Sequence, residues 1–496
     1  MKKIALNILA LLVASTTFAY KNYTHTPGVS GDDGRAAGCS PSNEKLFMEF
    51  NNVRGLIETA GSLWQDRANS NPSYEVPING GNHCLYAGAL WMGGVDVNGQ
   101  LKLAAHRFRQ GNDFWAGPLG DLIEGTGNFD PFTPQNAELT LYKDNGAAEI
   151  IPSECTKYDR FYTIRKNEVE QFILWWKCEN GVLDPEDCED VEEPDSEIMD
   201  RIINWPAHGE EGLGQDKYLA PFYDNDPDGG GGNRIYDPIN DGDYPWYDIN
   251  EEIDCRNDRR ITLFGDETHW WVFNDKGNIH TDTGGDPIGM EVRAQAFSFA
   301  TDDAINDMTF YNYELINRGT QTLFETYFGQ YVDPDVGYAF DDFVGCDVER
   351  GLGYCYNGDA TDEGGNGQPG YGSNVPAIGV DFFEGPYQDN DGVDNAIGIG
   401  DNEALNGIGY GDGVADNERF GMRRFVYYNN SGSQNGDPSA ASDYYNYLRG
   451  IWKNGQPMLF GGNGFNSGTT TLETDFMFPG DSDPLNWGTQ GVDPGL

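Results

Sequence analysis

Three segments between residues 290 and 332 constrain the fold most, because each has the pattern of a β-strand and only a short turn separates it from the next. They are residues 290–300, 308–317 and 323–332. In the first segment Met290 and Val292 fall on one face, whereas Glu291 and Arg293 fall on the other. The pattern predicts an antiparallel meander that packs on a second layer.

Composition agrees with a fold built from strands and turns. The 496 residues include 66 Gly and 25 Pro, and 13% are aromatic, which is too many for a simple disordered chain. We expect a mainly β fold: antiparallel β-sandwich modules with long Gly/Asp-rich loops and a few short helices. The expected divisions are a signal peptide (1–19), an N-terminal β region (20–150), a mixed region with short helices (151–288) and a β-sandwich with a long Asp/Gly-rich insertion (289–496).

Local patterns predict one further hairpin and two helices. A strand from Leu85 and its return strand flank Asn98-Gly99, a pair that favours a type I′ turn. Asn167 and Glu170 have the spacing of a capping box at the start of a helix. Apolar residues recur at helical spacing at positions 169, 172, 173 and 176, and again at positions 198, 199, 202 and 203.

The chain is strongly acidic. It has 31 Lys and Arg against 81 Asp and Glu, which gives a formal net charge of −50. A polyanion of this size disfavours nucleic acids and anionic membranes as partners and favours divalent cations. The alternative is a secreted protein whose acidic surface serves solubility alone.

The first acidic loop, 224–243, resembles the start of an EF-hand loop. Its first three aspartates stand at loop positions 1, 3 and 5, and Gly229 stands at position 6. The twelfth position is Ile235 instead of the usual bidentate Glu, so aspartates further along are expected to supply the missing oxygens. The predicted calcium ligands are Asp224, Asp226, Asp228, Asp237, Asp241 and Asp243.

The second acidic loop follows the third strand-like segment and runs to Asp359. Its carboxylates are dense, no Lys lies among them, and like charges this close repel one another. Hard oxygen ligands crowded on a loop suit calcium, which takes six to eight of them. The alternative is a solvated acidic loop. The predicted ligands are Asp333, Asp335, Asp341, Asp342 and Asp347.

The third acidic loop lies between residues 389 and 418. It belongs to a long Gly-rich stretch, and a loop of that length without strands or helices is unusual inside a compact domain. Bound calcium would explain how such a stretch stays ordered, whereas the alternative is a flexible acidic linker. The predicted ligands are Asp389, Asp391, Asp394, Asp412, Asp416 and Glu418.

The N-terminus has the features of a secretory signal peptide. Lys2 and Lys3 precede the apolar run 4–13, and small residues lead to a cleavage site after Ala19. The apolar run is too short to span a bilayer, and no later segment is apolar enough to do so. We therefore expect an exported protein, located outside the cell or on its outer surface.

Cysteine usage fits an oxidising compartment. The count is even and no CxxC occurs, which argues against zinc ribbons and thioredoxin-like sites and favours structural disulfides. Close spacing favours two local bonds, Cys346–Cys355 and Cys178–Cys188, and the other pairings stay open. The eight residues are Cys39, Cys84, Cys155, Cys178, Cys188, Cys255, Cys346 and Cys355.

Many phrases of the chain, in order from about Asn51 to Gly491, resemble a group of large secreted Bacteroidota proteins. Examples are NGGNHCLYAGALWMGG, LKLAAHRFRQGNDFWAGPL, MEVRAQAFSFA, YFGQYVDPDVG, DDFVGCDVERGLGYCYNGD and GYGDGVADNERFGMRRFVYYNN. The resemblance implies export by the type IX secretion system. Members of the group usually continue into further β domains and a C-terminal sorting domain, so the chain resembles their N-terminal half.

Short catalytic signatures do not occur in the sequence. It has no GxSxG, HExxH or Walker motif, which favours a protein without catalytic activity. With 81 acidic residues, any pair of carboxylates has the types that a glycosidase uses, and Asp381 with Glu384 is the least implausible pair. The stretch 269–271 with His280 has residue types found in sugar and metal sites, although aromatic pairs in strands more often belong to a core.

Two hypotheses about function follow. The first is a calcium-stabilised structural or adhesive β protein at the cell surface, exported by type IX secretion. Its expected partners are an extracellular glycan or protein, or the secretion machinery. The second is a secreted hydrolase or glycan-binding protein that acts on polysaccharide or protein and in which calcium is structural only.

Overall fold

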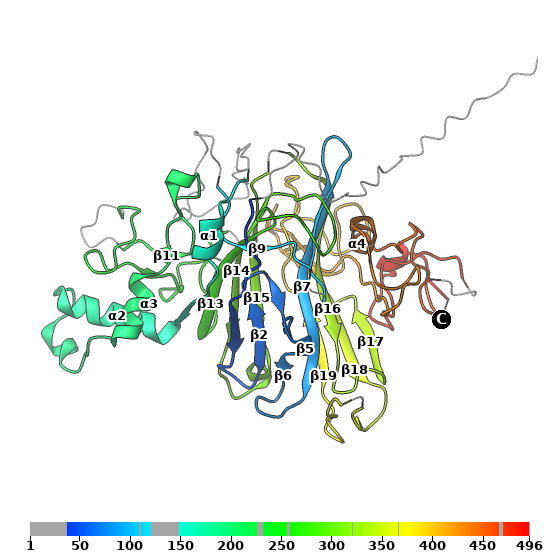
Figure 1. Ribbon diagram of the computed structural model, residues 1–496, viewed down its shortest axis with the longest axis horizontal. Coiled ribbons are helices and arrows are strands. Elements are labelled where there is room, and N and C mark those ends of the chain that lie inside the picture. Colours follow the sequence, from blue (N-terminus) through cyan, green and yellow to red (C-terminus); the bar gives the residue numbers. More distant parts are fainter. Residues whose placement is uncertain are drawn as a thin grey trace, which may run out of the picture. The chain divides into compact units, whose positions relative to one another are not determined.

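Two antiparallel sheets form the centre of the fold in the computed structural model (Figure 1). The first sheet has seven strands in the order β1-β2-β3-β7-β16, with β6 beside β2 and β7, and β8 beside β7. Its strands are β1 (Lys45–Met48), β2 (Arg54–Glu58), β3 (Ser62–Leu63), β6 (Tyr74–Glu75), β7 (His83–Val95), β8 (Leu101–Ala104) and β16 (Phe324–Pro334). The structure describes residues 37–108, 111–120, 148–225, 232–254, 258–319, 321–365, 367–465 and 470–495.

The second sheet has five strands in the order β10-β13-β14-β15, with β9 beside β13. Its central strand β13 is buried along its whole length because both of its faces are covered. Trp271 and Phe273 face the core between the two sheets, whereas Trp270 and Val272 face a helical layer. The strands are β9 (Trp115–Ala116), β10 (Tyr162–Arg165), β13 (Glu267–Asn274), β14 (Met290–Ser298) and β15 (Phe310–Asn317).

The two sheets pack face to face as a β-sandwich. Trp64, next to β3 in the first sheet, donates an indole N–H bond of 2.8 Å to the hydroxyl of Tyr311 in the second. A Cβ at Gly61 would lie 2.8 Å from the ring of Phe273, so the two layers approach closely at this glycine. The expected mainly β fold is confirmed.

The third strand-like segment does not join the predicted meander. β14 pairs with β15 over eight residue pairs, as predicted, but β16 pairs with β7 in the first sheet. The prediction of a three-stranded meander is therefore wrong. The chain therefore passes from the second sheet to the first sheet between β15 and β16.

The hairpin around residues 96–100 is confirmed, but its turn differs from the prediction. β7 pairs with β8 from Met92 to Val95, and the N–H of Gly99 bonds to the carbonyl of Asp96. Gly99 has a φ of 77°, whereas Asn98 does not have a positive φ. A type I′ turn needs positive φ at both central residues, so the loop is a longer turn with Gly at the left-handed position.

Both predicted helices are present. α2 (Lys166–Glu179) buries Val169, Phe172 and Trp176, and α3 (Ser196–Ile203) buries Ile198 and Ile202. The capping box lies two residues earlier than predicted and involves residues 165 and 168. The two helices cover the outer face of β13, where Trp270 and Val272 belong to the same hydrophobic cluster.

A third sheet has the order β17-β18-β19 and lies on the opposite side of the sandwich from α2 and α3 (Figure 1). On its inner face Ile378 and Val380 pack against the sandwich core, and Phe425 fills the space beside Gly353. Its strands are β17 (Asp342–Asp347), β18 (Leu352–Asn357) and β19 (Ala377–Asp381).

The remaining elements are short. The pairs β4–β5, β11–β12 and β20–β21 are two-stranded, and two more α-helices and four 3-10 helices complete the described part. They are β4 (Gln65–Asp66), β5 (Asn71–Pro72), β11 (Phe222–Tyr223), β12 (Tyr244–Pro245), β20 (Gly407–Ile408), β21 (Arg419–Phe420), α1 (Pro152–Lys157), α4 (Ala441–Leu448), η1 (Pro185–Cys188), η2 (Glu211–Leu213), η3 (Ala304–Asp307) and η4 (Trp487–Thr489).

The predicted domain boundaries do not coincide with the edges of the sheets. Contacts group Ala36–Leu496 into one compact unit. β9 and β10, from either side of residue 150, both pair with β13, and β16 pairs with β7 across the expected boundary at 288. The predicted signal peptide lies outside the described residues. No helix in the described part of the chain is long and apolar enough to cross a membrane.

The described part of the chain contains two disulfides. The predicted Cys178–Cys188 bond is confirmed, and a second bond joins Cys39 to Cys155, 116 residues away in sequence. Cys255 lies outside the described residues.

The predicted bond between Cys346 and Cys355 is wrong, because both have free, buried thiols. The register of the β17–β18 hairpin aligns Cys346 with Gly353 and Cys355 with Val344. The two cysteines are therefore diagonal neighbours. Diagonal neighbours lie roughly 7–8 Å apart, whereas a disulfide needs Cα atoms about 4.4–6.8 Å apart.

Candidate cation sites

The first acidic loop is organised around Asp243. Its side chain is fully buried, and its two oxygens accept the backbone N–H groups of Asn225 (2.8 Å) and Asp237 (2.7 Å). Burial, followed by the nearby carboxylates of Asp224 and Asp241, raises the pKa of Asp243 to about 7. The loop therefore brings three of its predicted ligands close together.

The other carboxylates of this loop already have partners. Asp224 accepts the N–H of Arg234 at 2.9 Å, and Asp241 accepts the side-chain amide of Asn233 at 2.6 Å. Asp237 bonds to Asn240, which lowers the pKa of Asp237. The predicted ligands Asp226 and Asp228 lie outside the described residues.

In the second loop three predicted ligands have pKa values far above the ordinary value for Asp. The pKa of Asp335 is raised to about 8, first by burial and then by the charges of Asp333 and Asp342. The pKa values of Asp333 and Asp342 are each raised to about 6, again mainly by burial. These three carboxylates lie where a positive charge would relieve both desolvation and mutual repulsion.

Three buried oxygens of the second loop lack a hydrogen-bond partner among the described residues. They are Oδ1 of Asp341, Oδ1 of Asp342 and Oδ1 of Asn357. Asp342 and Asn357 stand opposite each other on β17 and β18, so their side chains share one face of the hairpin. Buried oxygens without a donor are uncommon in folded proteins, and a bound cation is one explanation for them.

Two residues near this loop escaped the predictions from sequence. Asn357 is 8% exposed, and a search for clustered acidic residues does not find it because its side chain is neutral. Asp362 is 1% exposed and accepts the N–H of Tyr371 at 2.7 Å, and its charge contributes to the raised pKa of Asp342. The predicted ligand Asp347 instead pairs with Arg350 at 2.6 Å.

In the third loop the carboxylates bind backbone N–H groups. Asp416 accepts the N–H groups of residues 391 and 392 at 2.7 and 2.8 Å, and Asp394 accepts those of Gly411 and Gly413 at 2.8 and 2.7 Å. These bonds connect the two ends of the loop across about twenty residues of sequence. Backbone donors thus supply much of the compensation that the sequence alone assigned to cations.

Three other predicted ligands of this loop also accept hydrogen bonds from the protein. Asp391 accepts the side-chain amide of Asn402 at 3.0 Å, Asp412 accepts the N–H of Val414 at 2.9 Å, and buried Glu418 accepts the N–H of Asn395. Asp389 is exposed to solvent. Across the described ranges no three His, Cys, Asp or Glu side chains are arranged so that they could hold a metal ion.

The second loop leads to a prediction about pH. Asp335 ionises near pH 3.9 in an unfolded chain but only near pH 8 in the folded protein, so folding favours its protonated form. The resulting stability is complete below about pH 4 and is lost as the pH rises through about 8. Without divalent cations, the melting temperature should therefore fall from pH 5 to pH 8.

Asp335→Asn tests the origin of this loss. The amide keeps the shape of the side chain but carries no charge, so at pH 8 in chelator the variant should be more stable than the unsubstituted protein by about 1 kcal/mol. Melting curves measured from pH 5 to pH 8 give the comparison. Asp347→Asn is the control, since Asp347 pairs with Arg350. An equal slope in Asp335→Asn and the unsubstituted protein would contradict the prediction.

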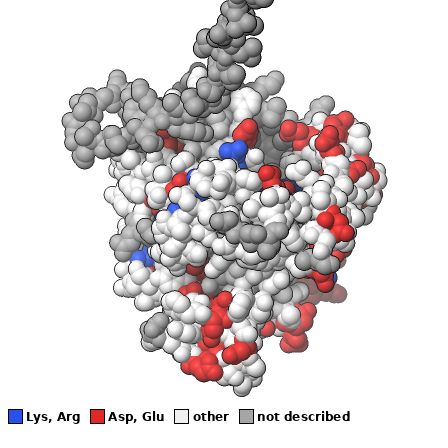
Figure 2. Space-filling view, turned by 90° about the vertical axis from the view of Figure 1, so that its right-hand side faces the viewer, with Lys and Arg blue, Asp and Glu red and all other residues white. Residues whose placement is uncertain are grey.

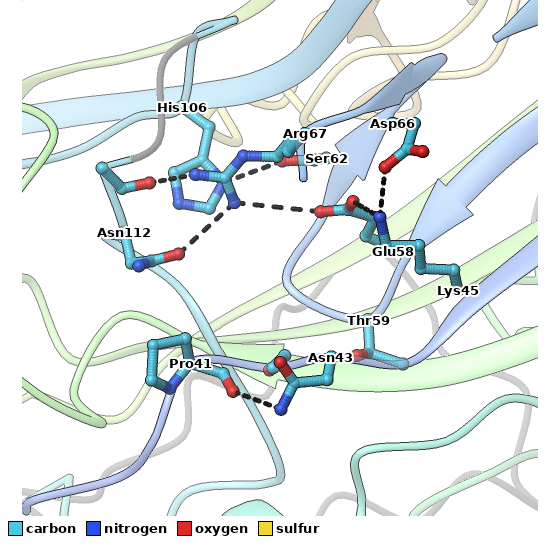
Figure 3. Close-up of polar contacts among 12 residues, drawn as sticks. Pro41, Asn43, Lys45, Glu58, Thr59, Ser62, Asp66, Arg67, His106 and Asn112 are labelled. Carbon is cyan, nitrogen blue, oxygen red and sulfur yellow. Dashed lines mark hydrogen bonds and ion pairs between the residues drawn. The ribbon is translucent and has the colours of Figure 1, made fainter. Parts of the chain in front are cut away.

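A separate polar cluster lies beside the first sheet (Figure 3). Glu58 is 8% exposed and lies between Lys45 (3.4 Å) and Arg67 (3.8 Å). Burial raises the pKa of Glu58, and the two cations oppose this rise only in part. Arg67 also donates to Asn112 at 3.3 Å. The cluster joins β1, β2 and the segment after β8, and its cations are already engaged by protein oxygens.

Ser62 and His106 in this cluster have the residue types of a nucleophile and a base, but their geometry does not fit that chemistry. Nε2 of His106 accepts the N–H of Asp113 at 2.9 Å, so the proton of a neutral ring lies on Nδ1, 3.2 Å from the Ser62 hydroxyl. His106 is therefore a donor toward Ser62 and does not act as its base. Burial lowers the pKa of His106 well below its ordinary value.

The other catalytic candidates also have structural surroundings. Trp270 and Trp271 are 1% and 0% exposed and belong to two different cores. Both ring nitrogens of His280 lie within 2.9 Å of backbone carbonyl oxygens, where neither presents a lone pair to a metal. Glu384 forms an ion pair with Arg419.

The acidic surface is visible on the side of the molecule where α4, β17 and β18 lie (Figure 2). Asp and Glu are numerous on this face, and Lys and Arg are few. The second loop combines three half-buried carboxylates of raised pKa with three buried oxygens that lack a partner in the described part of the chain, which makes it the best candidate for a cation. Comparisons with known proteins add no family: no family model, no curated protein and no solved structure matches the chain.

Proposed function

We propose that the protein is a secreted or cell-surface β protein with a structural or adhesive role, stabilised by calcium at its acidic loops. One observation carries the proposal: the second loop holds the half-buried Asp335 and Asp342, both with raised pKa values, beside buried oxygens that have no donor among the described residues. Calcium is the cation that suits such a site, because it accepts carboxylate and amide oxygens in flexible geometry.

Export is the second part of the proposal. The signal-like segment 1–19 and the resemblance to type IX secretion cargo favour a location outside the cell or on its outer surface. The disulfides Cys39–Cys155 and Cys178–Cys188 are compatible with it, since such bonds persist in oxidising compartments. Measurement of the mature N-terminus of secreted protein tests this part: a chain that keeps residues 1–19 would contradict it.

A structural or adhesive role accounts for the described part of the chain better than catalysis does. Its buried polar groups, such as Ser62 with His106, are engaged in holding segments together. A secreted hydrolase with structural calcium is the alternative. Release of product from polysaccharides or casein by the purified protein, with and without chelator, would favour that alternative.

The calcium proposal predicts a thermodynamic linkage. An ion that binds only the folded chain, at a free concentration a hundredfold above its Kd, adds about 2.7 kcal/mol per site. Removal of calcium by a chelator should lower the melting temperature and make the segment 358–416 the first target of a protease. Calorimetry with calcium, with magnesium and with chelator, followed by mass spectrometry of proteolytic fragments, measures both effects.

Matched variants locate the site. Asp342→Asn removes a half-buried carboxylate of the second loop and should reduce the stabilisation that calcium confers. Asp347→Asn lies on the same strand but removes a carboxylate that pairs with Arg350, so it should leave that stabilisation nearly unchanged. A melting temperature that does not respond to chelator, or an equal response of both variants, would count against a cation in this loop.

A further inference from the structure

The outer face of the β17–β18–β19 sheet carries aromatic side chains, two of which are exposed to solvent. The register aligns Phe343 with Tyr356 and Gly345 with Tyr354, and alternation places all four on one face of the sheet. The opposite face carries Val344, whose neighbours on the same face pack against the protein interior. Phe343 is 57% exposed and Tyr356 is 44% exposed, so this face is open to solvent.

Two of the rings lie directly against glycine backbone. A Cβ at Gly345 would lie 2.5–2.8 Å from three atoms of the Tyr354 side chain, and a Cβ at Gly358 would lie 2.6 Å from the Phe343 ring. Only glycine leaves the space that these rings occupy. The Tyr354 ring thus lies against the backbone of β17, and the Phe343 ring lies against the residue that follows β18.

The three rings make one continuous surface. The Phe343 and Tyr356 centroids are 6.1 Å apart with an interplanar angle of 25°, and the Tyr354 and Tyr356 centroids are also 6.1 Å apart, at 36°. Both interplanar angles are small, so the faces of neighbouring rings point in similar directions. We call Phe343, Tyr354 and Tyr356 the aromatic platform.

Carboxylates border the aromatic platform. Asp347 on β17 and Asp381 on β19 lie on the same face, since both align with Leu352 of β18. Their oxygens are hydrogen-bond acceptors at the end of the row of rings. Asp347 is held by Arg350, and the charge of Asp347 contributes to raising the pKa of Asp381 after burial does.

We propose that the aromatic platform binds a neutral polysaccharide, with pyranose rings stacked on Phe343, Tyr354 and Tyr356. The C–H groups of a pyranose face carry partial positive charge and fit the negative face of an aromatic ring. The sugar hydroxyls then donate hydrogen bonds to Asp347 and Asp381. This inference deepens the proposed adhesive role and rests on it, because the chain must meet the polysaccharide outside the cell.

The charge of the molecule selects this partner over the others that an exposed aromatic surface attracts. Acidic side chains border the platform, and the chain has a net charge of −50, which repels nucleic acids, anionic membranes and acidic polysaccharides. A second copy of the chain carries the same charge and is repelled as well. A neutral, hydroxyl-rich ligand has no such penalty and uses the carboxylates as acceptors.

Calorimetric titration of the full chain with cellohexaose, xylohexaose and mannohexaose tests the proposal, with an alginate hexasaccharide as the charged counterpart. Binding of at least one neutral hexasaccharide and not of alginate is expected. The double variant Phe343→Ala/Tyr356→Ala should lower the affinity about tenfold or more, because it removes two of the three stacking surfaces. Gly345→Ala should also weaken binding, since its methyl group displaces the Tyr354 ring.

Two controls separate stacking from general damage. Phe324→Ala removes a phenylalanine of similar exposure (53%) on β16 and should leave the affinity unchanged. Tyr356→Phe keeps the ring and should retain binding. Near-ultraviolet circular dichroism and melting curves establish that each variant is folded.

The proposal is overturned if no neutral hexasaccharide binds, if alginate binds more tightly, or if the folded double variant binds as well as the unsubstituted chain. The calcium proposal is judged by the melting temperature in chelator and therefore succeeds or fails separately. Sugar binding without a chelator effect would support the aromatic platform as a binding site and would contradict the calcium proposal. A chelator effect without sugar binding would support the calcium proposal and would contradict sugar binding at the platform.

Discussion

Arg293→Ala should lower the free energy of unfolding by about 3–5 kcal/mol, because it removes one of the two cations that face the buried carboxylate of Glu291. Arg293 lies on β14, and its side chain is 6% exposed. It bonds to Asp216 at 2.6 Å and to Glu291 at 2.9 Å, and Glu314 lies 3.8 Å away. The Glu291 side chain is 1% exposed, so water cannot replace the lost cation.

Arg318 does not compensate for this loss. It contacts the same Asp216, and it lies 3.5 Å from Glu291, so the network would keep one cation for three acidic groups. Chemical denaturation at pH 7 measures the loss in stability. Arg350→Ala is the matched control: its side chain is 71% exposed in a pair with Asp347, and its removal should change stability by about 0–1 kcal/mol. Similar effects of the two substitutions would contradict a buried network.

Trp64→Ala should destabilise the protein by about 3–5 kcal/mol as well, here by opening a cavity between the two sheets. Trp64 is 3% exposed, and its ring centroid lies 5.7 Å from that of Tyr74 and 5.9 Å from that of Tyr311. Gly88 leaves the space for the indole, since a Cβ there would lie 2.4 Å from it. Neighbours held in two sheets cannot move together to fill the vacated volume.

Tyr311→Phe separates packing from hydrogen bonding at the same place. It removes the acceptor of the Trp64 indole N–H, a bond of 2.8 Å, but keeps the ring. Its expected effect is about 1 kcal/mol, to which the unpaired N–H contributes. Denaturation curves of the two variants give the comparison. An effect of Tyr311→Phe as large as that of Trp64→Ala would show that the cavity is not the main cause.

Elements encoded by neighbouring residues were predictable from the sequence. β14 and β15, the β7–β8 hairpin, α2 and α3 all follow from periodicity and turn residues within a few positions. The course of β16 was not predictable in this way, because its alternation suits either layer of the sandwich. Its pairing with β7, a strand more than 200 residues earlier in the chain, places it in the first sheet.

The same division applies to the candidate site. Spacing identified the acidic loops, and the bond between Cys178 and Cys188, ten residues apart, follows from proximity in sequence. Spacing did not distinguish carboxylates whose two oxygens both accept backbone N–H groups, such as Asp394, from those with one buried oxygen that lacks a partner among the described residues, such as Asp342. That difference depends on which distant segments lie next to each carboxylate in the folded protein, and the local sequence does not encode it. Asn357 was missed for the same reason.

The sequence by itself determined a mainly β chain of high negative charge, because side-chain alternation and net charge are properties of neighbouring residues and of their sum. Only the tertiary structure determined that the polar face of β14 is buried, with Glu291 and Arg293 in an ion-pair network. It also decided the exposure of Phe343 and Tyr356 on an open sheet. The physical reason is that burial depends on which segments meet in space, and those contacts join residues far apart in the chain.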